Sequence, residues 1–242
     1  MKIYLVAYGD DNYACQREHF YATALKSSLF DQIFMYSQLN IDPIFYTQVY
    51  EPIRKYRGGG YWIWKPYFVK KALDRIKTGD ILVYCDAGCT INGYGKNRFN
   101  EYIEMACASN TGTVDFSLIW AEFQYTKREV FEFYNCPDRI INSTQLHSTV
   151  LILKKCTHTS LLVEEWYRAA TDNTFLFTDE KRLPQHSGFI DHRHDQSVFS
   201  VLRKNMGANI INDEVCYIAD GIYYGSTEDL DNYPFWSTRL IG

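Results

Sequence analysis

The sequence predicts an α/β fold: a single domain, residues 1–242, with a central, mostly parallel sheet flanked by helices. Two observations lead to this prediction. Short apolar runs typical of strands alternate with longer segments whose apolar residues recur at helical spacing. The 242 residues contain no repeat, low-complexity tract or linker, and 46% of them are hydrophobic, enough for a sizeable core. The predicted strands cover residues 3–7, 32–36, 81–85, 116–120 and 149–153.

Segments with helical spacing lie between or after most of these strands. They cover residues 15–29, 160–171 and 196–204. A further helix is predicted to begin near Pro66, because proline suits the first helical turn, and to stop before Gly79. The glycine triplet 58–60 that precedes it is predicted to be a loop. The buried face of this helix would carry Val69, Ala72, Leu73 and Ile76.

Charge and cysteine content narrow the class of protein. A formal net charge of -4 gives no general attraction to phosphate backbones, so nucleic acid is not an expected partner. The seven cysteines form no CxxC pair, and an odd, dispersed set does not indicate a disulfide framework. No stretch approaches the roughly 20 apolar residues of a membrane span, and the N-terminus has no signal-peptide core. We therefore expect a cytoplasmic protein without a transmembrane segment.

The strand 81–85 leads directly into Asp86, Ala87 and Gly88. This strand is apolar throughout, as in a sheet centre covered on both faces, and open α/β sheets bind ligands at the carboxyl ends of such strands. An aspartate there could bind a divalent cation that neutralises a pyrophosphate, and a glycine lets a ligand approach the backbone. The alternative is an Asp-Gly turn that only leaves the strand.

A polar loop with an aromatic residue follows the first predicted strand. Asp10 and Asp11 could hydrogen-bond a base or a ribose, and Tyr13 could stack on the base. The alternative is an aspartate that caps the next helix.

An aromatic segment with one lysine precedes the helix that begins near Pro66. Lys65 could present its ammonium to an anionic ligand near the helix N-terminus, where backbone N–H groups also favour anions. At least one of the two tryptophans, Trp62 and Trp64, is expected in the core instead.

Six polar residues, 191–196, lie just before the last predicted helix. Asp195 could cap this helix, but a cap needs only one residue, so the neighbouring His192, His194 and Gln196 favour a functional site. A His-x-His pair can bind metal, although no cysteine cluster accompanies it as in structural zinc sites.

Two further polar segments have open roles. Gln145 and His147 lead into the strand 149–153, where they either line a pocket or simply alternate out of the sheet. Residues 125–128 are predicted to begin a helix on the surface, with their polar side chains in solvent.

Three blocks of the sequence together resemble a known family. They are Gly60-Tyr61-Trp62-Ile63-Trp64-Lys65-Pro66, then Gly79-Asp80-Ile81-Leu82 with Tyr84 and Asp86-Ala87-Gly88, and finally His192-Arg193-His194-Asp195-Gln196-Ser197. These blocks look like those of bacterial and viral glycosyltransferases with a GT-A type fold, which act in the synthesis of surface polysaccharides such as lipopolysaccharide and capsule. The likeness spans most of the chain.

The resemblance implies a nucleotide-sugar donor, commonly a UDP-sugar, bound at the carboxyl edge of the sheet with Mn²⁺ or Mg²⁺. It also implies a glycan or glycolipid acceptor, and a lipid-linked acceptor would add peripheral association with a membrane. Gln145 and His147 would lie on the acceptor side. The residues expected on the donor side are Asp10, Asp11, Tyr13, Tyr61, Trp64, Lys65, Asp86, Ala87 and Gly88.

One position departs from the pattern of this family. Many GT-A enzymes have Asp-x-Asp at this turn, whereas here Gly88 takes the third position, so the second carboxylate ligand is missing. The metal would then be bound by Asp86 with His192 or His194, or Lys65 would supply the cation in its place.

The Asp195-Gln196 pair is similar to the Asp-Gln that retaining transferases place under the donor sugar. This likeness implies that Asp195 holds sugar hydroxyls, that Gln196 lies near the anomeric carbon, and that the reaction retains the anomeric configuration.

Two other functions remain open from the sequence. A metal-dependent nucleotide-sugar hydrolase or phosphohydrolase would use the same Asp86 and transfer sugar or phosphate to water. A non-catalytic carbohydrate-binding subunit would stack glycans on the aromatic residues, of which the chain has 20 Tyr, 15 Phe and 5 Trp. That second alternative leaves the polar run 191–196 without a role.

Overall fold

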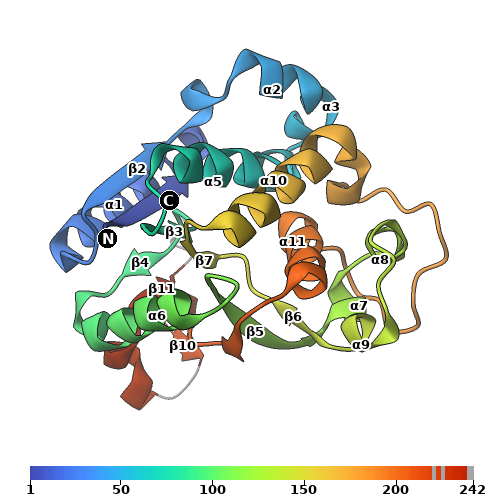
Figure 1. Cartoon of the computed structure of the whole chain (residues 1–242). Coiled ribbons are helices and arrows are strands. Elements are labelled where there is room, and N and C mark those ends of the chain that lie inside the picture. Colours follow the sequence, from blue (N-terminus) through green and yellow to red (C-terminus); the bar gives the residue numbers. More distant parts are fainter. Residues whose placement is uncertain (220–221, 225–226, 239–242) are drawn as a thin grey trace.

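The computed structural model describes residues 1–219, 222–224 and 227–238. Within these residues, seven strands form the central sheet in the spatial order β2, β1, β3, β7, β5, β6, with β8 paired beside β5. Helices cover both faces of the sheet (Figure 1), so the predicted α/β fold is confirmed. The strands are β1 (Ile3–Tyr8), β2 (Gln32–Tyr36), β3 (Ile81–Cys85), β5 (Thr113–Ala121), β6 (Thr144–Leu146), β7 (Val150–Lys154) and β8 (Ile210–Asn212).

The sheet is mixed, which corrects the expectation of a mostly parallel one. β1 runs parallel to β2 and β3, and β8 runs parallel to β5. However, β7 is antiparallel to both of its neighbours, β3 and β5, and β6 is antiparallel to β5. β6 and β7 are two parts of one extended segment, interrupted at 147–149, that lies along β5. An apolar run in the sequence carries no information on the direction of the strand it forms.

The strands and helices predicted from the sequence are found in the structure at the same or overlapping positions. Two predicted strands, 32–36 and 81–85, coincide with β2 and β3, and the other three overlap β1, β5 and β7. Residues 58–60, predicted to be a loop, form part of the short turn α4 (Gly58–Tyr61), in which the glycines are not helical. The predicted helices correspond to α1 (Ala14–Ser27), α5 (Trp64–Arg75), α10 (Thr157–Asp172) and α11 (His194–Met206).

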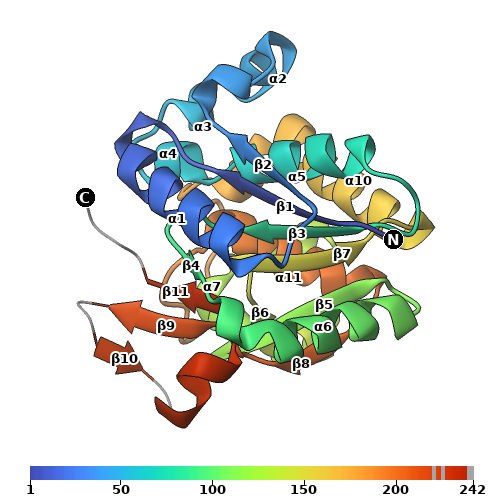
Figure 2. The ribbon, with the colours of Figure 1, turned by 90° about the vertical axis from the view of Figure 1, so that its left-hand side faces the viewer.

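The sheet separates two apolar layers because side chains alternate along each strand. On β3, Ile81, Val83 and Cys85 pack with α1 and α6 (Lys96–Ala108), whereas Leu82 and Tyr84 pack with α5, α10 and α11. In Figure 2, α5 and α10 lie above the strands β1, β3 and β7, and α6 lies below them. Burial on both faces explains why β3 is apolar throughout.

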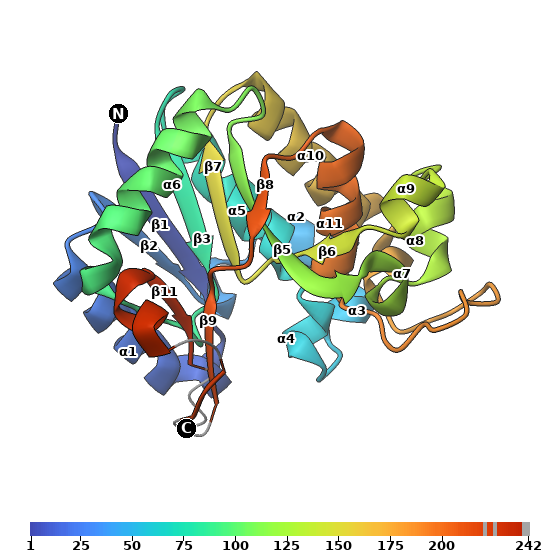
Figure 3. The same ribbon diagram turned by 90° about the horizontal axis from the view of Figure 1, so that it is seen from below.

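Shorter elements complete the fold. The helices α2 (Pro43–Gln48), α3 (Tyr50–Ile53) and α4 connect β2 to α5. The helices α7 (Glu122–Tyr125), α8 (Arg128–Phe133) and α9 (Asp138–Ile141) lie together beside α11 (Figure 3). A second sheet contains β4 (Thr90–Ile91), β9 (Cys216–Ala219), β10 (Ile222–Tyr224) and β11 (Phe235–Ser237). In the part of the chain that the structure describes, no helix is long and apolar enough to span a bilayer.

Residues 125–128 do not form the solvated surface that the sequence suggested. Thr126 and Lys127 are fully buried. The Lys127 ammonium donates hydrogen bonds to the backbone carbonyls of Phe175, Thr178 (2.8 Å) and Glu180 (3.0 Å). These carbonyls lie in and just after the 3₁₀ helix η4 (Thr174–Phe177), and a lysine has three N–H donors to offer them. The buried lysine therefore caps a distant segment.

Two buried ion pairs connect α11 to its neighbours. Arg203 lies 2.9 Å from Asp115 on β5, and each of these side chains is only 1% exposed. Lys204 pairs with Glu122 at the start of α7, which is also buried. Buried ions are tolerated when they are paired, because a lost partner leaves an uncompensated charge away from water. The two pairs therefore fix where α11 lies against β5 and α7.

We expect Arg203→Met to lower the free energy of unfolding by about 3–5 kcal/mol, since it leaves Asp115 buried without its cation. Urea unfolding followed by circular dichroism measures this difference. The matched control is Arg168→Met, because Arg168 makes only exposed ion pairs, with Glu164 and Glu165, and its loss should change the free energy by less than about 1 kcal/mol. Equal effects of the two variants would contradict the structural role of the Arg203 pair.

Candidate active site

A buried lysine joins two carboxylates at the carboxyl end of the central strands. The Lys65 ammonium lies 2.7 Å from Oδ2 of Asp195 and 3.2 Å from Oδ1 of Asp86. It also donates a hydrogen bond to the backbone carbonyl of Ser148, 3.1 Å away. We call Lys65, Asp86 and Asp195 the charge cluster. Its members come from three separate elements, so only the folded chain assembles them.

Local structure places each member of the charge cluster. Asp86 directly follows β3, while Lys65 and Asp195 lie in the first turns of α5 and α11. The chain enters α5 through the tight turn α4, where Gly60 has a φ of 99°. A Cβ at Gly60 would lie 2.5 Å from the Cα of Ile53, so only glycine fits there. The glycine triplet therefore sets the approach of the chain to Lys65.

Burial and charge oppose each other in the charge cluster. Burial disfavours the ammonium form of Lys65, but Asp195 and Asp86 outweigh it and raise the pKa of Lys65. Burial raises the pKa of Asp195 to about 6, and Lys65 opposes that shift. The sequence suggested that Lys65 presents its ammonium to an anionic ligand. Its side chain is only 3% exposed, and its ammonium faces the two carboxylates instead.

Asp86 is the accessible carboxylate of the charge cluster. Its side chain is 30% exposed, compared with 5% for Asp195. Tyr84, two residues earlier on β3, donates a hydrogen bond of 2.6 Å to Oδ1 of Asp86. In the turn that follows, Ala87 is buried, and the carbonyl of Gly88 accepts a hydrogen bond from another part of the chain. Asp86 is therefore anchored through one oxygen while part of its carboxylate reaches solvent.

Gln196 lies beside the charge cluster in a chain of amide hydrogen bonds. Its Oε1 accepts a hydrogen bond from the backbone N–H of Ser148 (3.2 Å), and its Nε2 donates one to Oε1 of Gln145 (2.7 Å). Gln145 was expected on the acceptor side, but this side chain is fully buried and hydrogen-bonds Gln196. His147 is half-buried, and its backbone carbonyl accepts a hydrogen bond from Arg203 (2.7 Å).

A pocket of about 310 Å³ lies at the same edge of the sheet. Asp10 and Asp11 both line it, as the sequence suggested, whereas Tyr13 is half-exposed and is not among its lining residues. Asp10 also accepts a hydrogen bond of 3.0 Å from the backbone N–H of Asn12, so it caps the 3₁₀ helix η1 (Asp11–Tyr13) as the alternative interpretation held. The lining residues are Tyr8, Asp10, Asp11, Asn12, Gln38, Ile41, Tyr46, Ile53 and Gly59.

The pocket and the charge cluster are neighbours. β1 and β3 pair in parallel, so Tyr8 at the end of β1 and Asp86 just beyond β3 lie at the same edge of the sheet. The ring of Tyr8 packs on buried Trp64, with the centroids 4.1 Å apart, and Trp64 directly precedes Lys65. β2 and β3 lie on opposite sides of β1, so the strand order reverses at β1. Open α/β sheets bind ligands where the strand order reverses.

The two predicted metal-binding histidines are turned into the protein. Nε2 of His192 donates to the carbonyl of Leu176 (2.8 Å), and Nδ1 accepts from the backbone N–H of Lys127 (3.3 Å). Nδ1 of His194 donates to the carbonyl of Phe177 (2.7 Å). Burial lowers the pKa of both histidines, that of His194 to about 4. Both rings therefore tie the start of α11 to η4.

The donor set of the charge cluster fits a divalent cation only in part. Among the described residues, no group of three or more His, Cys, Asp or Glu side chains is placed to hold a metal ion. Asp86 could still supply one oxygen, with water and substrate phosphates as the other ligands that Mg²⁺ and Mn²⁺ accept.

Tyr61 was expected on the donor side. It packs instead on His194, with the ring centroids 5.0 Å apart.

Three residues that build the site were not predicted: Tyr84 as a partner of Asp86, Gln38 in the pocket, and Glu122. For two of them a signal was present. Tyr84 shares a face of β3 with Asp86, because residues two apart on a strand point the same way. Gln38 follows β2 at the same edge of the sheet as Asp10. Glu122 had no sufficient local signal, because three of its four side-chain partners, Gln145, Ser200 and Lys204, come from distant segments.

Solved structures resemble this chain, although no protein family and no curated protein matches it in sequence. A glycosyltransferase involved in the glycosylation of the major capsid of PBCV-1 superposes with a TM-score of 0.54 and 7% identity, over 98% of this chain and 92% of that one. The galactosyltransferase LgtC, in complex with donor and acceptor sugar analogues, gives 0.45 and 12% over 95% and 83%. Mouse xyloside xylosyltransferase 1 gives 0.44 and 9% over 90% and 88%. The fold assignment rests on the first alone: this chain has the mixed α/β fold of GT-A glycosyltransferases.

Proposed function

We propose that this chain is a glycosyltransferase domain that transfers a sugar from a nucleotide-diphosphate sugar to a glycan or glycolipid acceptor. One observation carries the proposal: the charge cluster lies beside a 310 Å³ pocket at the carboxyl ends of β1 and β3. The GT-A type fold supports it. The proposed setting is polysaccharide biosynthesis in the cytoplasm, at the membrane surface if the acceptor is lipid-linked.

The pocket is suited to the nucleoside of the donor. Asp10, Asp11 and Asn12 line one part of it, and their side-chain oxygens can accept hydrogens from base N–H and ribose hydroxyl groups. Ile41 and Ile53 add apolar contacts. The volume is at the lower limit of about 300–1,000 Å³ for small-molecule sites, so the diphosphate and sugar would extend out of the pocket towards the charge cluster. A uridine nucleotide is the donor that we propose to test first.

We propose that Asp86 is the protein ligand of a Mn²⁺ or Mg²⁺ ion that the donor phosphates help to bind. When bound, this ion would neutralise charge on the departing diphosphate. Asp86 suits the task because Tyr84 and Lys65 hold it through Oδ1 while its side chain stays partly exposed. His192 and His194 would have to break hydrogen bonds to the backbone in order to assist.

Asp195 and Gln196 are suited to stabilise an oxocarbenium-like centre. Asp195 offers its carboxylate oxygens, and Gln196 its amide carbonyl oxygen, to the positive charge that develops at the anomeric carbon. Lys65 and Ser148 hold them in place, so little rearrangement is needed when the sugar arrives. This pairing supports the proposal of transfer with retention of the anomeric configuration.

We expect uridine diphosphate, or another nucleoside diphosphate, to raise the melting temperature of the protein, because a ligand that binds only the folded state stabilises it. A thermal-shift panel of uridine, guanosine, thymidine and cytidine diphosphates and their common sugars, with and without Mn²⁺, measures this effect. Asp10→Ala should abolish the shift, while Asp42→Ala, a helix-capping aspartate outside the pocket lining, should keep it. Failure of every nucleotide at millimolar concentration would refute the donor site.

Gln196→Ala should lower turnover while leaving donor affinity nearly unchanged, whereas Asp195→Ala should weaken both, since a residue that holds sugar hydroxyls acts before and during bond breaking. Release of nucleoside diphosphate in the presence of a glycan panel gives kcat and KM. Wild-type turnover in both variants would exclude this helix start from the active site. Release of sugar to water, at a rate that no glycan raises, would indicate a nucleotide-sugar hydrolase instead.

Removal of divalent cations should abolish turnover, and added Mn²⁺ should restore it in the wild type but not in Asp86→Ala. The reason is that Asp86 is the accessible carboxylate of the charge cluster. The experiment titrates Mn²⁺ into the same assay after chelation. Full activity in excess chelator would disprove the metal proposal, and undiminished stimulation of Asp86→Ala would assign the ion to another residue.

A further inference from the structure

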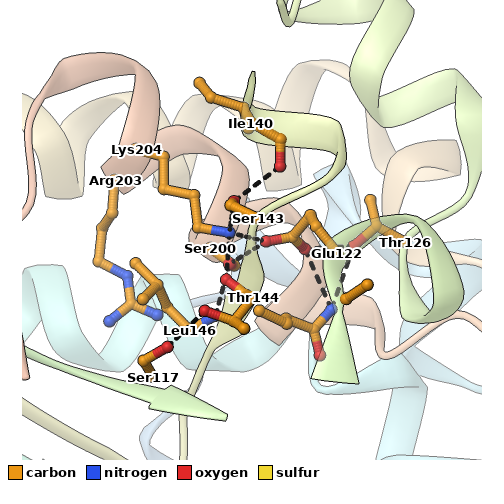
Figure 4. A network of polar contacts seen from close by, with 12 residues as sticks. Ser117, Glu122, Thr126, Ile140, Ser143, Thr144, Leu146, Ser200, Arg203 and Lys204 are labelled. Atoms are coloured by element: carbon orange, nitrogen blue, oxygen red, sulfur yellow. Dashed lines mark hydrogen bonds and ion pairs between the residues drawn. The ribbon is translucent and has the colours of Figure 1, made fainter. Parts of the chain in front are cut away.

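We propose that Glu122 is a positioning residue that fixes which end of the Gln196 amide faces the charge cluster. The proposal rests on the proposed function, in which Gln196 lies near the anomeric carbon. Glu122 begins α7 and is completely buried. Figure 4 shows its carboxylate surrounded by side chains from Thr126 just after α7, from Ser200 and Lys204 on α11, and from the segment before β6.

The two oxygens of Glu122 accept hydrogen bonds from all four polar groups that surround them. One oxygen, Oε2, pairs with the Lys204 ammonium and accepts a hydrogen bond from the hydroxyl of Ser200 (2.5 Å). The other, Oε1, accepts hydrogen bonds from the hydroxyl of Thr126 (2.6 Å) and from Nε2 of Gln145 (3.2 Å). An ionised carboxylate has no hydrogen to donate, so Gln145 must present its NH₂ group to Glu122.

Groups of opposite character fix the amide of Gln145 from its two ends. Its NH₂ group faces the carboxylate of Glu122 and the carbonyl of Tyr125 (3.3 Å), which can only accept. Its Oε1 faces the guanidinium of Arg193 (3.4 Å), which can only donate. Turning this amide over would place its oxygen against a carboxylate and its NH₂ group against a guanidinium. One orientation is therefore strongly preferred.

The orientation of the Gln145 amide determines which end of the Gln196 amide can hydrogen-bond to it. Because Gln145 offers Oε1 on this side, Gln196 must present its own NH₂ group, and the two atoms lie 2.7 Å apart. Oε1 of Gln196 then points to the backbone N–H of Ser148 (3.2 Å), whose carbonyl contacts Lys65. A carbonyl oxygen stabilises an oxocarbenium-like centre, whereas an NH₂ group would oppose it. The N–H of Ser148 favours the same orientation of Gln196 from the other end, and Glu122 reinforces it through Gln145 without contacting the substrate.

The first test is Glu122→Gln, which keeps the size of the side chain but can donate as well as accept. The amide of Gln145 is then oriented by the carbonyl of Tyr125 and the guanidinium of Arg193 but no longer by a carboxylate, so it orients Gln196 less strictly. We expect kcat to fall by roughly 10–100-fold while the donor KM changes less than about twofold. The matched control is Asp115→Asn, the same isosteric change at another buried carboxylate that pairs with α11. Asp115→Asn should lower the melting temperature by about as much as Glu122→Gln does, and it should leave kcat within about twofold of the wild type. Equal kcat in both variants would overturn the proposal.

The second test is rescue. Gln196→Glu places an acceptor-only carboxylate against Oε1 of Gln145, and Glu122 and Arg193 both oppose the turning over of Gln145 to donate to it. Gln196→Glu should therefore lose both melting temperature and turnover, and adding Glu122→Gln should recover part of both, with a gain in kcat of roughly tenfold over the single variant. A double variant whose losses are simply the combined losses of the single variants would overturn the proposal.

A third measurement does not depend on turnover. In protein with ¹⁵N-labelled glutamine, Glu122→Gln should shift the side-chain amide signals of both Gln145 and Gln196, and Asp115→Asn should shift neither. An unchanged Gln196 signal would overturn the proposal. If the Gln196 signal shifts but the wild type turns over no nucleotide sugar, the orientation by Glu122 holds and the proposed function fails.

Discussion

The buried ammonium of Lys65 is the interaction on which the rest of the site depends. It contacts Asp86 after β3, Asp195 on α11 and the backbone of Ser148 before β7. Without it, Asp195 would be buried beside Asp86 with no cation, and both burial and the neighbouring carboxylate would raise its pKa further. Even with Lys65 present, the pKa of Asp195 is raised to about 6. The lysine therefore opposes protonation of Asp195 and ties two helices to the edge of the sheet.

Helix α11 carries much of what surrounds this contact. Its first turn supplies Asp195 and Gln196, while Arg203 and Lys204 near its other end pair with β5 and α7. Ion pairs therefore hold the helix at both ends, and each is buried, so sliding or rotation would expose uncompensated charge to the interior. A helix fixed in this way suits a site in which small displacements of side chains would change the chemistry.

The turn after β3 carries a single carboxylate, Asp86, because Gly88 occupies the position after Ala87. The second carboxylate that contacts Lys65 is Asp195 on α11. Lys65 lies between the two. One ammonium against two carboxylates leaves a single net negative charge, and the accessible part of it is on Asp86. That arrangement is compatible with a cation bound jointly by Asp86 and a diphosphate.

The sequence by itself determined the local elements and the residues at the strand ends. An apolar β3 followed by Asp86, and a proline at the start of α5, are signals within a short window, and both elements lie where they were predicted. Only the tertiary structure decided the antiparallel direction of β7, the burial of Lys127 and the contacts of His192 with the backbone. A polar side chain has the same letter in the sequence whether it lies in solvent or is buried. Burial requires a partner that compensates for lost hydration, and here those partners come from distant segments that meet only when the sheet and its helices pack.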